Sequence, residues 1–188
     1  MNIDLNDRMV LFTGSDTVVT AHAKKALVAN GASVIDDTAV PDLLIVSFPL
    51  VPCADIQLEP SVAKARSVAQ AMGTGSRIVF ILSAIAAMPM RRYPEYSTQM
   101  AAALAAMRVL AMEHGPKVLV NALGVGLLGE PEEAGDAAML SHVPQGRAAT
   151  RDEVIAPLLF LCDPLNSYTT GQILSVDGGW SAGYGRNF

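Results

Sequence analysis

Short, continuous runs of apolar residues recur along this chain and are separated by segments with helical spacing. Three of the clearest runs are Met9–Thr13, Leu43–Phe48 and Arg77–Ser83. Strands that are apolar on both faces belong to sheets that are covered by helices on both sides. Strands that alternate with helices along a chain form parallel sheets. The sequence therefore predicts an α/β fold, a single doubly wound parallel sheet of about six strands.

The apolar runs and helical segments together predict one domain that covers residues 1–188. The expected strands are Met9–Thr13, Ala32–Ile35, Leu43–Phe48, Arg77–Ser83, Lys117–Leu123 and Gln172–Val176. The expected helices are Thr17–Asn30, Pro60–Met72, Pro94–His114 and Arg151–Cys162. We expect Glu130–Asp136, which is acidic and contains Gly and Pro, to form a mobile loop.

The composition excludes several classes of protein. Charged residues make up 16% of the chain and hydrophobic residues 51%, and such a chain buries enough apolar surface to fold. The longest uncharged runs, Ile78–Met90 and Pro164–Val176, are shorter than the ~20 residues that cross a bilayer, so we expect no membrane span. The net charge of −5 argues against binding to nucleic acid. The apolar excess favours a covered sheet together with a subunit interface.

The N-terminal residues and the cysteines favour a cytoplasmic location. Asp4 and Arg8 precede the first apolar run, so no secretory signal is expected. Cys53 and Cys162 have neither metal-binding nor redox spacing, which predicts reduced cysteines in the core. The three histidines show no ligand spacing either, and we predict no metal site.

Motifs at the ends of the expected strands resemble those of the short-chain dehydrogenase/reductase (SDR) family. Thr13-Gly14 follows the first strand, Ser83 ends a later strand, and Tyr96 lies in the helix that follows it. The chain also contains Val120-Asn121-Ala122, Thr170-Gly171 and the ending Asp177-Gly178-Gly179-Trp180. The resemblance runs from Met9 nearly to the C-terminus and implies a Rossmann-type fold.

The resemblance implies catalytic roles for Ser83 and Tyr96. In the family, the serine orients the substrate carbonyl, the tyrosine transfers the proton, and a lysine four residues later lowers the pKa of the tyrosine. Met100 occupies that lysine position here, and the family's upstream asparagine is also missing. A tyrosine with an ordinary pKa is ionised to about one part in a thousand at pH 7. We therefore expect Ser83 and Tyr96 to be vestiges of a catalytic group.

The loop that binds the cofactor in the family is also altered. Of the family's TGxxxGxG motif only Gly14 remains, and Val18 and Thr20 carry branched side chains where close approach to pyrophosphate is needed. Asp36 lies about 20 residues after Gly14, where the family has a ribose-binding acid. A solvated acidic turn is the interpretation of Asp36 that we favour. We predict no cofactor with confidence; NAD(H) or NADP(H) binds only if this degenerate site still accepts a dinucleotide.

The connection between the second and third expected strands is too short for a helix. Only Asp36–Asp42 separates them, whereas a helical crossover takes a dozen residues or more. We therefore expect the strand–helix unit on the family's adenine side to be deleted, so that the third expected strand lies beside the first. The bulky Phe48 and Pro49 stand where the family has a strand end beneath the cofactor, and we expect a packed strand end there.

These losses predict an SDR homologue that has lost NAD(P)-dependent catalysis. Such a chain would act as a homo-oligomer or as the non-catalytic partner of a complete dehydrogenase. The resemblance implies contacts through the Ala-rich helix Pro94–His114, which could equally be ordinary core, and through the C-terminal tail Asp177–Phe188. One alternative is a residual NAD(P)(H)-dependent carbonyl or alcohol oxidoreductase. Another is a cofactor-independent Ser/Tyr enzyme of halohydrin-dehalogenase type, although those enzymes place arginine where Met100 stands.

Overall fold

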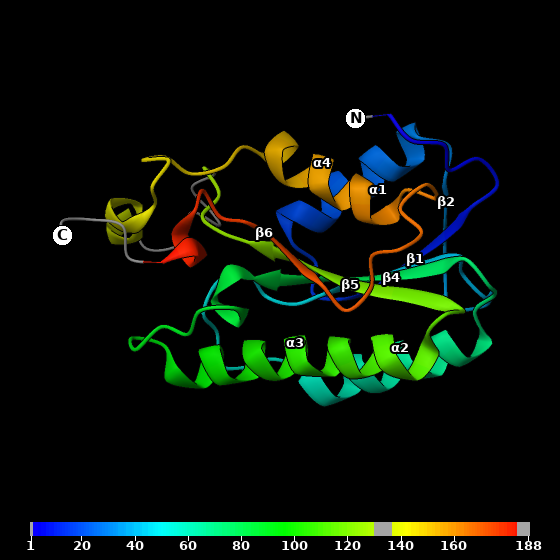
Figure 1. Ribbon diagram of the computed structural model, residues 1–188, viewed down its shortest axis with the longest axis horizontal. Helices are drawn as coiled ribbons and strands as arrows, with labels where there is room; N and C mark the ends of the chain where they lie inside the picture. The colour runs from blue at the N-terminus through cyan, green and yellow to red at the C-terminus, as the bar shows by residue number, and fades with distance from the viewer. Residues whose placement is uncertain (1, 130–136, 184–188) are drawn as a thin grey trace.

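A six-stranded parallel sheet with helices on both faces forms the centre of the molecule (Figure 1). The computed structural model describes residues 2–129 and 137–183, and the predicted loop Glu130–Asp136 lies outside them. The sheet order is β2-β1-β3-β4-β5-β6, and its strands are β1 (Met9–Gly14), β2 (Ser33–Ile35), β3 (Leu43–Ser47), β4 (Ser76–Ser83), β5 (Val118–Val125) and β6 (Ile173–Val176). The helices are α1 (Val18–Ala29), α2 (Leu58–Ala71), α3 (Pro94–His114) and α4 (Arg151–Cys162). The predicted doubly wound α/β fold is thus confirmed.

Two apolar cores lie on opposite faces of the sheet. Helices α2 and α3 cover one face, and helices α1 and α4 cover the other (Figure 1). Side chains alternate between the faces along each strand, so Leu44 and Val46 of β3 join the core beneath α2 and α3. Leu43 and Ile45 of the same strand join the core beneath α1 and α4. This double burial explains why β3 is apolar at almost every position.

Every strand and helix bound lies within two residues of the sequence prediction, and the differences have local causes. Helix α3 begins with Pro94 at its first position, where a missing N–H costs nothing. Helix α4 begins after Thr150, whose hydroxyl accepts a hydrogen bond from the Glu153 amide in a capping box. Helix α2 begins at Leu58, before the proline that was expected to start it. Strand β5 runs on to Val125, because it pairs with β4 up to Ser83.

The short connection between β2 and β3 works as predicted. It returns the chain so that β3 pairs directly with β1, with Val10 opposite Leu43, and the family's additional strand–helix unit is absent from this edge of the sheet. Asp42 holds the start of β3 in place next to β1 and β4. Its carboxylate accepts hydrogen bonds from the Met9 amide at 2.9 Å and from Arg8 Nη1 at 3.2 Å. Its carbonyl accepts from the Arg77 amide at 2.9 Å, so one residue joins the starts of β1, β3 and β4.

The two cysteines differ in their surroundings. Cys162 is fully buried, as predicted, and burial raises the pKa of its thiol to about 12. The prediction that both cysteines lie in the core is wrong for Cys53, which is exposed. The physical reason is that Cys53 lies between β3 and α2, beyond the two covered faces of the sheet. None of the helices in the described ranges is long and apolar enough to cross a membrane.

Asp42→Ala tests the role of the short connection. We expect a loss of about 1.5–3 kcal/mol in the free energy of unfolding, because the hydrogen bonds from the Met9 amide and Arg8 to a charged group are lost. Urea denaturation measures the change. Asp37→Ala is the matched control in the same connection, since its ion pair with Lys64 is exposed and is worth less than about 1 kcal/mol. Equal effects of the two substitutions would contradict the role of Asp42.

Candidate functional site

The carboxyl ends of β1, β3 and β4 meet at one edge of the sheet, where open α/β sheets bind their ligands. Ser83 ends β4, and Tyr96 lies in the first turn of α3. The structure brings these two predicted residues together, and the Ser83 hydroxyl is a hydrogen-bonding neighbour of the Tyr96 hydroxyl. Gly14 lies at the end of β1, and Asp36 follows β2. The predicted residues are therefore spread along the edge, with only the serine and the tyrosine in contact.

The Tyr96 hydroxyl is hydrogen-bonded to another residue of the same chain. Its side chain is 3% exposed, and its hydroxyl donates a hydrogen bond to the Pro49 carbonyl oxygen at 2.6 Å. Burial raises the pKa of the Tyr96 phenol well above its ordinary value, and the hydrogen bond with Ser83 acts in the opposite direction and is weaker. The phenol is consequently neutral, and its proton points at a backbone oxygen.

Ser83 is also engaged in local structure. Its side chain is buried, and its hydroxyl accepts a hydrogen bond from the Ile85 amide at 3.4 Å. This contact caps the short 3-10 helix η1 (Ala84–Ala86) that follows β4. The serine therefore stabilises the turn that leads from the sheet toward α3.

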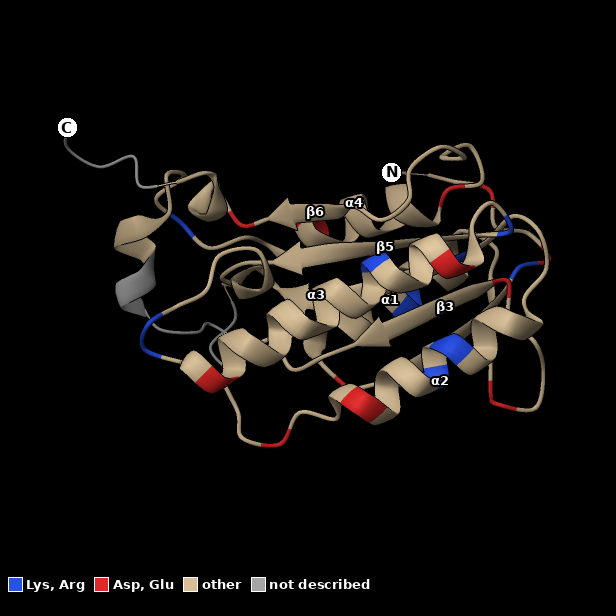
Figure 2. Ribbon diagram, turned by 60° about the horizontal axis from the view of Figure 1, so that its bottom comes forward, with Lys and Arg blue, Asp and Glu red and all other residues tan. Residues whose placement is uncertain are grey.

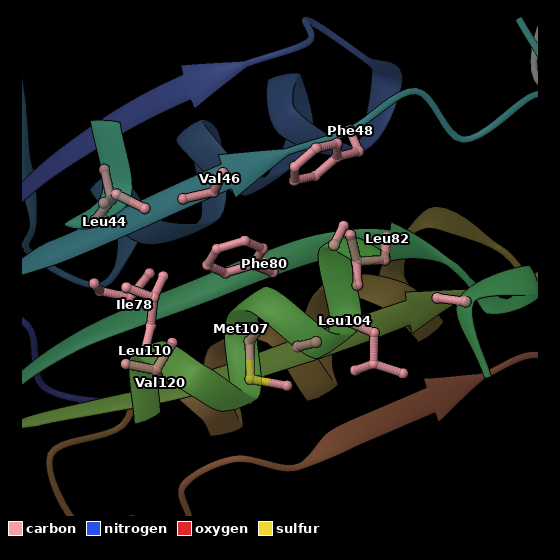
Figure 3. Close-up of a cluster of buried hydrophobic side chains, with 14 of the residues drawn as sticks. Leu44, Val46, Phe48, Ile78, Phe80, Leu82, Leu104, Met107, Leu110 and Val120 are labelled. Atoms are coloured by element: carbon pink, nitrogen blue, oxygen red, sulfur yellow. The ribbon is translucent and has the colours of Figure 1, made fainter. Parts of the chain in front are cut away.

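Met100, at the position of the family's lysine, lies wholly within the core beneath α2 and α3. Figure 3 shows the neighbouring part of this core, with Phe48 just after the end of β3 and Phe80 on the adjacent strand β4. Their rings stack with centroids 6.0 Å apart. The strand end at Phe48 is therefore packed, as expected from the sequence. The nearby Arg91 and Arg92 are exposed, and the Arg92 guanidinium lies over the Tyr93 ring at 5.5 Å.

Gly14 is required by the packing of the strands. Its φ of 91° suits glycine, and a Cβ atom at this position would lie 2.1 Å from the Ser47 carbonyl oxygen. The same oxygen accepts a hydrogen bond from the Ser15 amide at 2.8 Å. The one glycine that survives from the cofactor motif thus lets the ends of β1 and β3 touch.

The first turn of α1 is capped by its own side chains. Thr17 Oγ1 accepts a hydrogen bond from the Thr20 amide at 3.2 Å, and Thr20 Oγ1 accepts from the Thr17 amide at 2.8 Å. Asp16, just before the helix, forms an ion pair with Lys24 at 3.6 Å. Pyrophosphate sites at helix N-termini need free amide donors and no nearby negative charge. The residues present here therefore do not fit a dinucleotide's pyrophosphate.

Two hollows lined by residues of the described ranges lie near this edge of the sheet. The first, of about 210 Å³, is lined by Phe12, Thr13, Gly14, Ser15, Asp16, Thr20 and Lys24. The second, of about 260 Å³, lies at the ends of β5 and β6 and includes Arg147, Glu153 and Asp177 in its lining. The Arg147 guanidinium holds the pKa of Glu153 at about 2. Each hollow therefore contains one ion pair, Asp16 with Lys24 in the first and Glu153 with Arg147 in the second. The Asp177 carboxylate in the second hollow accepts hydrogen bonds from the Gly179 and Ser181 amides.

Asp36 forms an exposed turn. Its carboxylate accepts hydrogen bonds from the hydroxyl and the amide of Thr38, and these bonds lower the pKa of Asp36. This is the solvated acidic turn favoured from the sequence. No group of three or more His, Cys, Asp or Glu side chains within residues 2–129 and 137–183 could hold a metal ion.

Sequence reasoning missed two features of the site. The capping box of α1 could have been found, because Thr17 and Thr20 have the spacing at which such residues bond one another's amides. The hydrogen bond from Tyr96 to the Pro49 carbonyl could not have been found from the sequence. Every residue has a backbone carbonyl, so no residue type indicates which carbonyl accepts this bond.

A family model and several curated proteins are similar to this chain. A family model described as enoyl-(acyl carrier protein) reductase matches residues 52–181. The chain is 28% identical over 120 residues to 2-dehydro-3-deoxy-D-gluconate 5-dehydrogenase of Escherichia coli, covering 60% of this chain and 47% of that protein. It is 31% identical over 118 residues to D-erythrulose reductase of Gallus gallus, covering 58% and 48% respectively. The chain thus spans about half the length of the curated relatives it matches.

Solved structures share the fold at low sequence identity. A metagenomic blue fluorescent protein in complex with NADPH has a TM-score of 0.80 at 19% identity, covering 94% of this chain and 99% of that one. A gluconate 5-dehydrogenase from Burkholderia cenocepacia, in complex with NADP and tartrate, has a TM-score of 0.78 at 16% identity, covering 96% and 97%. The family model, the strand order and the Ser83–Tyr96 pair agree, and the chain belongs to the short-chain dehydrogenase/reductase family.

Proposed function

We propose that this chain is a non-catalytic member of the family, which does not transfer hydride with NAD(P) on its own. It acts as a subunit, either in a homo-oligomer or together with a complete dehydrogenase. A shared fold does not carry function with it unless the site is also kept. The proposal therefore rests on the chemistry of the residues at the family's catalytic and cofactor positions.

The observation that carries the proposal is the hydrogen bond from Tyr96 to Pro49. A tyrosine that transfers a proton needs a lowered pKa and a substrate oxygen within reach. The Tyr96 phenol has a raised pKa, and its proton already lies on a backbone carbonyl at 2.6 Å. Met100 supplies no charge to reverse this, since it is an uncharged side chain in the core.

The β1–α1 turn supports the same proposal on the cofactor side. The amides of Thr17 and Thr20 are bonded to each other's side chains, and Asp16 brings a negative charge to the turn. A pyrophosphate would have to displace the first contacts and would be repelled by the second. We therefore expect neither NAD(H) nor NADP(H) to bind in the family's manner.

The exposed face of α3 is the surface that we propose for subunit contact. Thr98, Ala101, Ala102 and Ala105 are exposed on this face, and α3 carries no charged residue from Tyr96 to Met107. Figure 2 shows this uncharged stretch between the charged residues nearer the ends of the helix. The C-terminal tail predicted as a second contact is described only as far as Gly183, and its remaining residues, 184–188, lie outside the described ranges.

A residual oxidoreductase is the second candidate function. It is favoured by structural relatives that hold NADPH or NADP in their solved structures and by the contact between Ser83 and Tyr96. We rank it second because it requires the dinucleotide to bind without the free amides and the lysine that the family uses.

Calorimetric titration with NADH and NADPH separates the two candidates. We expect dissociation constants weaker than about 1 mM for both, because the first turn of α1 is already capped. A complete dehydrogenase of the family, titrated in the same buffer, serves as the positive control. Micromolar binding of either dinucleotide would contradict the proposal and favour the residual oxidoreductase.

Met100→Lys tests whether the missing lysine alone explains the loss of activity. We expect no carbonyl reductase activity and a loss of about 3–5 kcal/mol in the free energy of unfolding, because an unpaired ammonium would be buried. Chemical denaturation and an NADPH oxidation assay measure the two outcomes. Met100→Leu, which keeps the volume and adds no charge, is the matched control and should cost less than about 1.5 kcal/mol. A stable, active lysine variant would refute the proposal.

Ala105→Glu tests the proposed contact surface on α3. We expect the wild-type chain to sediment as an oligomer and the variant as a smaller species, because two buried carboxylates across an interface repel. Ala21→Glu is the matched control, since Ala21 is an exposed alanine on α1. If Ala105→Glu leaves the oligomer intact, α3 is not the contact surface. A monomeric wild-type chain that also fails to bind a complete dehydrogenase would contradict the subunit role itself.

A further inference from the structure

The segment Pro49–Gln57, here called the strap, joins β3 to α2 without helix or strand. Its two ends are anchored in the core. Phe48, just before it, is buried against Phe80, and its amide donates to the Ile81 carbonyl at 3.0 Å. Ile56, near its other end, packs into the same core. The strap is therefore a loop whose two ends are held in the core.

The strap starts beside the Ser83–Tyr96 pair. Ser47 of β3 pairs with Ile81 of β4, so continuing this register by two residues brings Pro49 level with Ser83. At that point Tyr96 donates its hydrogen bond to the Pro49 carbonyl at 2.6 Å. Ser83 is the second hydrogen-bonding neighbour of the same phenol. Three elements, the strap, β4 and α3, thus meet at one hydroxyl group.

A backbone carbonyl offers the same acceptor chemistry as a substrate carbonyl. The family's serine and tyrosine both bind the oxygen of a ketone or aldehyde. We propose that the Pro49 carbonyl is an internal stand-in for that oxygen, and that the strap is an internal contact which closes the Ser83–Tyr96 pair to carbonyl compounds. Both side chains are at most 5% exposed with the strap in place. Any carbonyl compound must displace the strap before it can reach Tyr96.

This contact is independent of the cofactor. The strap closes the pair whether or not a dinucleotide binds at the β1–α1 turn, because Pro49, Ser83 and Tyr96 lie outside that turn. The contact also gives Ser83 and Tyr96 a structural role, which is to hold the strap, in a chain for which we propose no catalysis. Micromolar NADPH binding would contradict the proposed function but would not contradict the strap contact.

Amide hydrogen exchange on the full chain tests the contact. In Tyr96→Phe we expect the hydrogen-bonded amides at the two ends of the strap, Phe48 and Leu58, to exchange on the order of fivefold faster, the factor that corresponds to about 1 kcal/mol for one hydrogen bond. Amides in the middle of β4 should be unchanged. Tyr93→Phe is the matched control on the neighbouring tyrosine and should leave the strap as in the wild type. Unchanged strap exchange in Tyr96→Phe would overturn the proposal, as would an equal acceleration in β4.

Acetylation of the wild-type chain provides a test that needs no variant. N-acetylimidazole modifies accessible tyrosine hydroxyls, and peptide mass spectrometry locates the sites. Tyr168 is fully exposed and serves as the internal control. We expect Tyr168 to be acetylated and Tyr96 to remain unmodified in the folded chain. Acetylation of Tyr96 as fast as that of Tyr168 would mean that the strap does not close the pair, and would overturn the proposal.

Discussion

The close approach of β1 and β3 is the constraint on which the rest of the structure depends. Gly14 has no side chain, so the Ser47 carbonyl can lie where a Cβ atom would otherwise be. The ends of the two strands therefore stay together, and the next residue, Phe48, turns into the core against Phe80. Pro49 follows, and its carbonyl reaches Tyr96. In the family, this glycine lets the backbone approach a phosphate. Here Gly14 lets the end of β3 lie close to β1, and the residues that follow β3 lead to the Pro49 carbonyl that Tyr96 contacts.

The fold was largely predictable because its signals are local. Pro94 at the first position of α3 and Thr150 before α4 mark helix starts that any chain must respect. The length of Asp36–Asp42 excludes a helical crossover and so places β3 beside β1. The site was less predictable. Ser83 and Tyr96 could be found by their place in the family pattern, but the partner of Tyr96 is a backbone atom far along the chain. Only the folded backbone shows that this carbonyl is within reach.

The departures from the family pattern are mutually consistent. Met100 stands at the position of the family's lysine, and the amides of Thr17 and Thr20 at the start of α1 are bonded by the side chains of these two residues. The exposed face of α3 between Tyr96 and Met107 carries no charge, in a chain whose charged residues are 16% of the total. We propose that contact with another subunit covers this surface. The proposed role in association, without hydride transfer, agrees with both observations.

The central claim is that the Tyr96 proton is held by the chain itself and is not available for transfer. Carbon-13 NMR of tyrosine Cζ, with Tyr96 assigned from the Tyr96→Phe variant, follows the ionisation of this one phenol. Because burial raises its pKa, the Tyr96 signal should keep its neutral position as the pH passes about 10, the ordinary value for tyrosine. Folding stability linked to this group is present below that pH and is lost as the pH rises through the raised pKa. A Tyr96 signal that titrates below about pH 10 would contradict the account.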